Sequence, residues 1–195
     1  MALSLSKNQT ISLEKTAGSG LRNVTMGLGW DVAKPKGFLG KLMGGGGGSI
    51  DLDASALFFD ASGSLTDSVW FRQLKSTDGS VVHTGDNRTG AGDGDDEQIK
   101  VDLGRIPVGV QTIVFTVNSF LGQDFGKVEN AYCRLVNDAG GAEIARFNLS
   151  AGGAHTGQVM ARLYREGAGW NMQALGTPSN GRTFQDMLPD IRRSL

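Results

Sequence analysis

The sequence predicts an all-β fold, an antiparallel β-sandwich of two sheets with a few short helices. Apolar and polar residues alternate along residues 23–30, 50–54, 99–103 and 142–149. In a strand, this period of two puts the apolar residues on one face. Turn residues such as Asp78-Gly79-Ser80 separate the alternating segments at short intervals. Many short alternating strands between turns are typical of a sandwich.

The remaining elements follow in chain order. Residues 2–6 and 10–13 also alternate, and residues 112–117 form an apolar β-branched run that predicts a central strand. Residues 157–166 fit either a strand or a helix. Residues 183–193 predict a short terminal helix that Pro189 interrupts, because proline has no backbone N–H to donate.

The 195 residues predict a single domain with a core of its own. Within it, residues 32–50 have the composition of an insertion, since a Lys-containing segment leads into five consecutive glycines. Ordering such a run is entropically costly, so we expect a flexible tether.

Charge and composition exclude several classes of protein. The 19 basic and 20 acidic residues give a net charge of −1, so we expect no nucleic-acid partner. No stretch is long and apolar enough to enter a bilayer, so no direct membrane insertion is expected. The N-terminus has no apolar signal segment, and the one cysteine, Cys133, cannot form an internal disulfide. We therefore expect a cytoplasmic location.

One Gly-rich segment, residues 83–103, is crowded with acid: it contains Asp86, Asp93, Asp95, Asp96 and Glu97. Two carboxylates about 4 Å apart repel by about 4 kcal/mol near a protein surface, and a multivalent cation would remove this penalty. The oxygen donors here, which include the Asn87 amide, favour Ca²⁺ over Mg²⁺, whose geometry is stricter, and over zinc, which prefers His or Cys. The alternative is a solvated acidic turn.

The segment does not match an EF-hand loop, so a metal site would need ligands from elsewhere. Asp51 and Asp53 share one face of a strand at a period of two. Asp31 follows Trp30 at a strand end and is a further contributor. The predicted metal ligands are Asp31, Asp51, Asp53, Asp86, Asn87, Asp93, Asp95, Asp96 and Glu97.

Several blocks of the sequence resemble the TerD family of tellurium-resistance and stress proteins. They are Gly27-Leu28-Gly29-Trp30-Asp31, Asp51-Leu52-Asp53-Ala54-Ser55-Ala56 and His83-Thr84-Gly85-Asp86-Asn87-Arg88-Thr89-Gly90, followed by Gly94-Asp95-Asp96-Glu97. The resemblance implies a bacterial, cytoplasmic β-sandwich that binds Ca²⁺ through these loops and acts in tellurite resistance, stress response or phage defence. It also implies other tellurium-resistance proteins as partners, including a membrane-embedded Ter protein. Residues 177–195 lie outside the shared pattern and form a C-terminal extension.

No catalytic constellation stands out. The chain has two histidines, and His83 beside the acidic segment is interpreted as a structural residue. We therefore predict a non-enzymatic regulatory or scaffold protein. One alternative is a calcium-dependent module that binds a small ligand, such as a nucleotide, a sugar or a lipid headgroup. Another is a metal-dependent hydrolase, which would need a base beside an open metal site.

Overall fold

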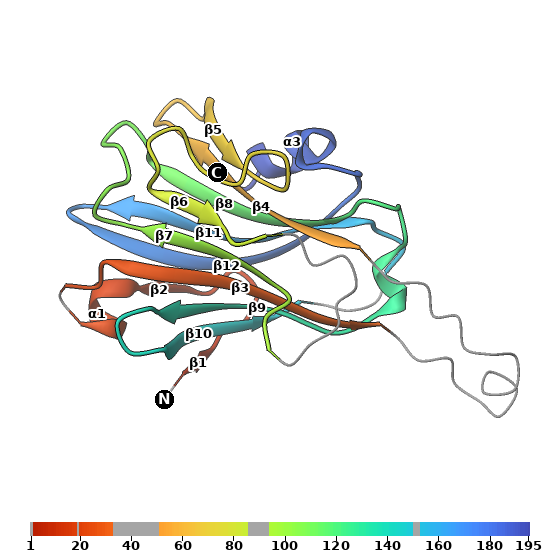
Figure 1. The fold of residues 1–195 in the computed structure, drawn as a ribbon, viewed down its shortest axis with the longest axis horizontal. Coiled ribbons are helices and arrows are strands. Elements are labelled where there is room, and N and C mark those ends of the chain that lie inside the picture. The colour runs from red at the N-terminus through yellow and green to blue at the C-terminus, as the bar shows by residue number, and fades with distance from the viewer. Residues whose placement is uncertain (1, 19, 33–50, 86–93, 150–152) are drawn as a thin grey trace, which may run out of the picture.

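The structure is a computed structural model that describes residues 2–18, 20–32, 51–85, 94–149 and 153–195. Within these residues, two six-stranded sheets pack face to face, which confirms the predicted sandwich (Figure 1). In order across the first sheet, the strands are β1 (Leu3–Ser4), β10 (Ala142–Asn148), β9 (Val128–Asn137), β3 (Asn23–Val32), β7 (Glu97–Asp102) and β6 (Val81–His83). Those of the second are β2 (Thr10–Ser12), β12 (Gly169–Ser179), β11 (Gly157–Glu166), β8 (Thr112–Ser119), β4 (Leu52–Phe59) and β5 (Leu65–Val69). The short β1 pairs with β10 in parallel, whereas the main pairings are antiparallel.

Helices are short in the described residues: α1 (Leu13–Ala17), the 3₁₀ turn η1 (Phe125–Lys127) and α3 (Phe184–Arg192). A capping box begins α3: the Thr183 side chain accepts the backbone N–H of Asp186, and the Asp186 carboxylate accepts the backbone N–H of Thr183. The prediction that Pro189 interrupts this helix is wrong, since α3 continues through it. Proline removes one backbone hydrogen bond, and side chains buried on both sides of Pro189 hold the helix on the sheet.

The core lies between the two sheets, and a second apolar cluster lies outside the second sheet. On β4, Leu52, Ala54, Ala56 and Phe58 face the core, which is the alternation expected of a strand. The residues between them face outward, but Leu57 and Phe59 are buried in one apolar cluster with Phe184, Met187 and Ile191 of α3. Because both faces of β4 are covered, its second half is a continuous apolar run rather than an alternating one.

Residues 177–195, expected as an extension, are integrated into this architecture. Residues 177–179 complete β12, and α3 places Phe184, Met187 and Ile191 on the outer face of the second sheet. The predicted insertion at 32–50 lies outside the described residues, apart from residue 32 at the end of β3. No helix in the described part of the chain is long and apolar enough to cross a membrane.

Candidate metal centre

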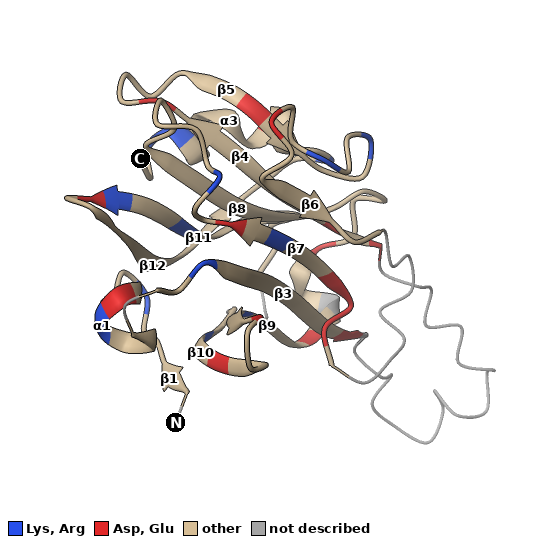
Figure 2. Ribbon diagram, turned by 60° about the vertical axis from the view of Figure 1, so that its left-hand side comes forward, with Lys and Arg blue, Asp and Glu red and all other residues tan. Residues whose placement is uncertain are grey.

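Acidic residues gather where β3 ends and where β4 and β7 begin, at one end of the sandwich (Figure 2). We call this set the acidic end; its described members are Asp31, Asp51, Asp53, Asp95, Asp96 and Glu97. The antiparallel pairing explains the convergence, because the end of β3 lies beside the start of β7: Leu28 pairs with Glu97. Residues separated by more than sixty positions in the sequence thus reach the same place.

Asp51 and Asp53 are almost fully buried, with exposed fractions of 6% and 4%. Asp51 directly precedes β4, and Asp53 lies in it on the face opposite to Leu52 and Ala54, which enter the core. Asp53 pairs across the sheet with Asn118 of β8. Two carboxylates buried so close together make this end of β4 strongly acidic.

Asp96 is held by the backbone of β3. Its Oδ2 accepts the Trp30 N–H at 2.9 Å, and its own N–H donates to the Leu28 carbonyl at 2.8 Å. Burial raises the pKa of Asp96; the hydrogen bond from Trp30 opposes this, and the charges of Asp31 and Asp95 raise the pKa further. The local potential is therefore negative, which is the environment that a bound cation would stabilise.

Glu97 links the two sheets. Its Oε2 accepts the Ala54 N–H of β4 at 2.6 Å and lies 3.5 Å from Nε2 of His83. The side chains of His83 and Glu97 are 1% and 0% exposed. His83 Nδ1 accepts the Gly85 N–H at 3.1 Å, which places the ring proton of a neutral imidazole on Nε2, facing Glu97. This geometry supports the interpretation of His83 as a structural residue.

Asp95 lies on the outer face of the first sheet. Its carboxylate is 2.7 Å from Nε and 3.2 Å from Nη2 of Arg134, and it also accepts hydrogen bonds from the Tyr132 hydroxyl and the Gln98 amide. A Cβ at Gly27 would collide with this carboxylate. The glycine in the middle of β3 is therefore what allows Asp95 to lie flat on the sheet.

The remaining predicted ligands divide into two groups. Asp31 is exposed, and its Oδ2 accepts a hydrogen bond from Asn130 Nδ2 at 2.8 Å. Asp86, Asn87 and Asp93 lie outside the described residues. Within the described ranges, no three His, Cys, Asp or Glu side chains form a group that could hold a metal ion. A complete centre would therefore need ligands beyond this part of the chain.

Sequence reasoning missed the polar side chains of β9 that contact the acidic end. Asn130, Tyr132 and Arg134 alternate with the buried Ala131, Cys133 and Leu135, so they share the outer face of the sheet. That alternation was visible in the sequence, but their contacts with Asp31 and Asp95 depend on the register between β9 and β3.

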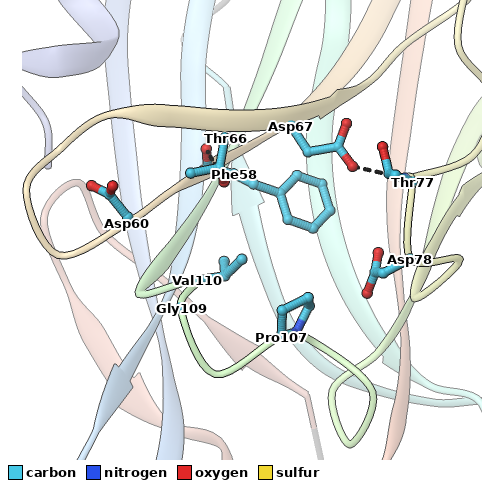
Figure 3. Close-up of a pocket in the computed structure, with 9 residues that line it drawn as sticks. All are labelled: Phe58, Asp60, Thr66, Asp67, Thr77, Asp78, Pro107, Gly109 and Val110. Atoms are coloured by element: carbon cyan, nitrogen blue, oxygen red, sulfur yellow. Dashed lines mark hydrogen bonds between the residues drawn. The ribbon is translucent and has the colours of Figure 1, made fainter.

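A cavity of about 550 Å³ lies at the other end of β4, lined by Phe58, Asp60, Thr66, Asp67, Thr77, Asp78, Pro107, Gly109 and Val110 (Figure 3). Its carboxylates brace turns. Asp60 Oδ1 accepts the backbone N–H groups of Ser62 and Ser64, and Asp67 Oδ2 accepts that of Thr77 at 2.8 Å. Asp78 Oδ1 likewise accepts the Ser80 N–H at 3.3 Å, so each of the three acids has a contact within the protein.

Comparison with known proteins identifies the family. A model of the TerD domain matches residues 1–190. The chain is 53% identical over 189 residues to tellurium resistance protein TerZ of Serratia marcescens, covering 97% of this chain and 96% of that protein. It is 42% identical to stress response protein SCP2 of Bacillus subtilis (strain 168), covering 96% and 98% of the two chains.

A solved structure supports the fold. The crystal structure of a homologue of telluride resistance protein (TerD), SCO6318 from Streptomyces coelicolor A3(2), aligns with a TM-score of 0.66 at 20% identity, covering 83% of this chain and 92% of that chain. At this identity the likeness shows the fold alone. The TerD match includes residues 177–190, so most of the expected extension falls within the domain. Taken with the sandwich and its acidic end, these matches show that the chain belongs to the TerD family.

Proposed function

We propose that this protein is a cytoplasmic calcium-binding protein of tellurium resistance and stress response, acting as a non-enzymatic regulatory or scaffold module. Membership of the TerD family supports the physiological part, because its relatives include proteins named for tellurium resistance and for stress response. Other tellurium-resistance proteins, among them a membrane-embedded Ter protein, are the proposed partners.

The observation that carries the calcium proposal is that carboxylates from three strands lie at the same end of the sandwich, the acidic end. Asp51 and Asp53 are buried there, and the pKa of Asp96 is raised by burial and by the neighbouring charges of Asp31 and Asp95. A cation would relieve the mutual repulsion of these carboxylates, and an oxygen-only donor set suits Ca²⁺.

The described acids fall into two groups with respect to the proposed ion. Asp95 forms an ion pair with the Arg134 guanidinium on the outer face of the first sheet, and the Glu97 side chain is buried beside His83, where it accepts the Ala54 N–H. We therefore propose that Asp31, Asp51, Asp53 and Asp96 supply ligands to one or two ions, and that Asp86, Asn87 and Asp93 complete the sites, because no three of the described acids form a group that could hold an ion.

The proposal that the protein is not an enzyme rests on the surroundings of His83 and Cys133. His83 is buried with its Nε2 facing Glu97, so it cannot reach a substrate as a base without rearrangement. Burial raises the pKa of the Cys133 thiol to about 12, so the thiolate nucleophile is scarce at neutral pH.

Calorimetric titration of metal-stripped protein with Ca²⁺ and with Mg²⁺ tests the proposal. We expect calcium to bind more tightly than magnesium and to raise the melting temperature, since a ligand at 100 times its Kd stabilises the folded state by about 2.7 kcal/mol. Asp53→Asn and Asp96→Asn should each weaken binding about tenfold or more, because a ligand loses its negative charge while its shape is kept.

Asp60→Asn is the matched control. Asp60 lies at the opposite end of β4, and asparagine keeps an oxygen that can accept the N–H groups of Ser62 and Ser64. This variant should bind calcium like the wild type. If calcium produced no heat of binding and no rise in melting temperature in the wild type, the proposal would be contradicted.

A further inference from the structure

We propose that Arg134 is a positioning residue for the cation site: together with Tyr132 it holds residues 94–95 on the outer face of the first sheet, and so fixes where Asp96 enters the acidic end. This inference rests on the proposed calcium site. It assigns Asp95 to anchoring the segment rather than to binding the ion.

The contacts between Arg134 and Asp95 have the geometry of a strong anchor. Two guanidinium nitrogens approach the two carboxylate oxygens, at 2.7 and 3.2 Å, which is a bidentate, charge-assisted pair. The Asp95 side chain is 1% exposed, whereas that of Arg134 is 28% exposed. Without Arg134, a nearly buried carboxylate would lack its cationic partner, so the segment would be driven to move.

Tyr132 adds a second hold one residue earlier. Its hydroxyl donates to the Gly94 carbonyl at 2.8 Å and lies 3.2 Å from Asp95 Oδ1. Gly94 has φ 103°, a backbone conformation that favours glycine, so a glycine at this position allows the chain to turn into Asp95 without strain. We call the contacts of Arg134 and Tyr132 with residues 94–95 the latch.

The neighbouring strand β10 keeps the latch rigid. The Arg146 guanidinium lies 3.8 Å from the centroid of the Tyr132 ring, and Glu143 contacts both Arg134 and Arg146 at 3.2 Å. These four side chains restrain one another's rotamers, so little entropy is lost when the segment docks.

Two glycines of β3 lie beneath the latch. A Cβ at Gly27 would collide with the Asp95 carboxylate, and one at Gly29 would lie 2.5 Å from the Tyr132 ring. Two glycines on the outer face of β3 therefore leave room for both latch side chains. This gives the Gly27-Leu28-Gly29 motif a structural purpose.

The latch acts on the proposed site through one peptide bond. Asp95 directly precedes Asp96, whose carboxylate and N–H are bonded to Trp30 and Leu28 of β3. Release of Asp95 would allow this short connection to shift, and Asp96 would lose its preset position. Residues that orient a metal ligand in this way typically change affinity by about 10- to 100-fold when mutated.

The experiment compares Asp95→Asn, Arg134→Met and the double variant in full-length protein. Calcium affinity is measured by calorimetry, and hydrogen exchange of residues 94–98 is measured in metal-free protein. We expect each single variant to weaken calcium binding about tenfold or more, and the double variant to be no weaker than the worse single one, because both remove the same contact. Exchange at Asp96 should accelerate in all three, and Arg134→Lys, which keeps the charge, should recover part of the affinity.

Arg162→Met is the matched control. Arg162 bonds Gln173 and the Ser194 carbonyl and stacks on Tyr164 on the second sheet, so its loss should affect stability without changing exchange at residues 94–98. Calcium affinity of wild-type strength in folded Arg134→Met would overturn the inference. So would additive losses from the two single variants, since they would mean that Asp95 binds the ion itself.

Failure of the proposed function gives a different result. If the wild type takes up no calcium, the calcium proposal fails, and the exchange measurement on metal-free protein then tests the latch alone. Faster exchange at residues 94–98 in Arg134→Met would support the latch, and unchanged exchange would overturn it.

Discussion

Helix α3 should contribute a large part of the stability of the sandwich, and Met187→Ala tests this. Met187 is 0% exposed and packs in the apolar cluster between α3 and the outer face of the second sheet. Truncation of a buried methionine to alanine typically costs about 2–5 kcal/mol, through lost burial and the cavity left behind. Against a total of about 5–15 kcal/mol for a domain, that loss would be visible at once in urea denaturation.

A substitution at Gly157 tests the packing of Met187 more specifically. A Cβ added there would lie 2.7 Å from Sδ and 3.1 Å from Cε of Met187, and 3.3 Å from the Val117 carbonyl oxygen. Gly157→Ala alone should therefore overpack the site and cost about 1–3 kcal/mol. In the Met187→Ala background the main collision is gone, so the same substitution should cost less.

Urea denaturation of the wild type, both single variants and the double variant measures the interaction energy. We expect the double variant to be at least about 0.5 kcal/mol more stable than the sum of the single effects predicts. If the two effects simply add, Met187 does not pack on Gly157 as described. A midpoint for Met187→Ala equal to that of the wild type would mean that α3 is not docked on the sheet.

Three further outcomes can be checked. Cys133, whose pKa burial raises to about 12, should resist a thiol reagent at neutral pH and react only in denaturant; rapid labelling of the folded protein would refute its burial. Burial raises the pKa of Glu143, but hydrogen bonds from two arginines outweigh this effect and hold the pKa below the usual 4.5. The folded state therefore binds a proton at Glu143 less readily than the unfolded state does. The ionised Glu143 stabilises the fold above pH 4.5, and this stabilisation is lost as the pH falls below that value. Glu143→Gln should accordingly flatten the fall in stability between pH 6 and pH 3, measured by urea titration at each pH, and an unchanged slope would argue against it. Asp67→Asn should lower the free energy of unfolding by about 1 kcal/mol without altering calcium affinity. Oδ2 accepts the Thr77 N–H at 2.8 Å and Oδ1 accepts the Gln73 amide at 2.9 Å, and asparagine has only one oxygen with which to accept them. An unchanged urea midpoint would contradict this bracing role.

Much of the fold followed from local pattern. The alternation along residues 23–30 and 99–103 predicted strands that the structure contains as β3 and β7. The ambiguity at 157–166 arose because a strand buried on both faces has no clean period, and β11 lies in the middle of the second sheet. The prediction that Pro189 interrupts the helix failed for the opposite reason. Proline disfavours a helix locally, but the packing of α3 against the sheet outweighs that preference.

The acidic end was only partly predictable. Asp51 and Asp53 were placed on one face of a strand by their spacing alone, and in the structure both are buried, Asp51 directly before β4 and Asp53 within it. The partners of Asp95 and Glu97 were not foreseen. They are Arg134 and the Ala54 N–H, which lie 39 and 43 positions away in the chain, and no local pattern specifies such pairings.

By itself, the sequence determined the β-sandwich class, the side of the alternating strands that faces the core, and the concentration of acidic side chains around residue 95. These properties depend on the period of two and on residue chemistry, which act within a few positions of each other. Only the tertiary structure decided which acids meet, and which of them are held by Arg134 or by the facing strand β4. Such contacts depend on strand order and register, which join residues that are distant in the chain, and a shift of one residue would turn every side chain of a strand to its other face.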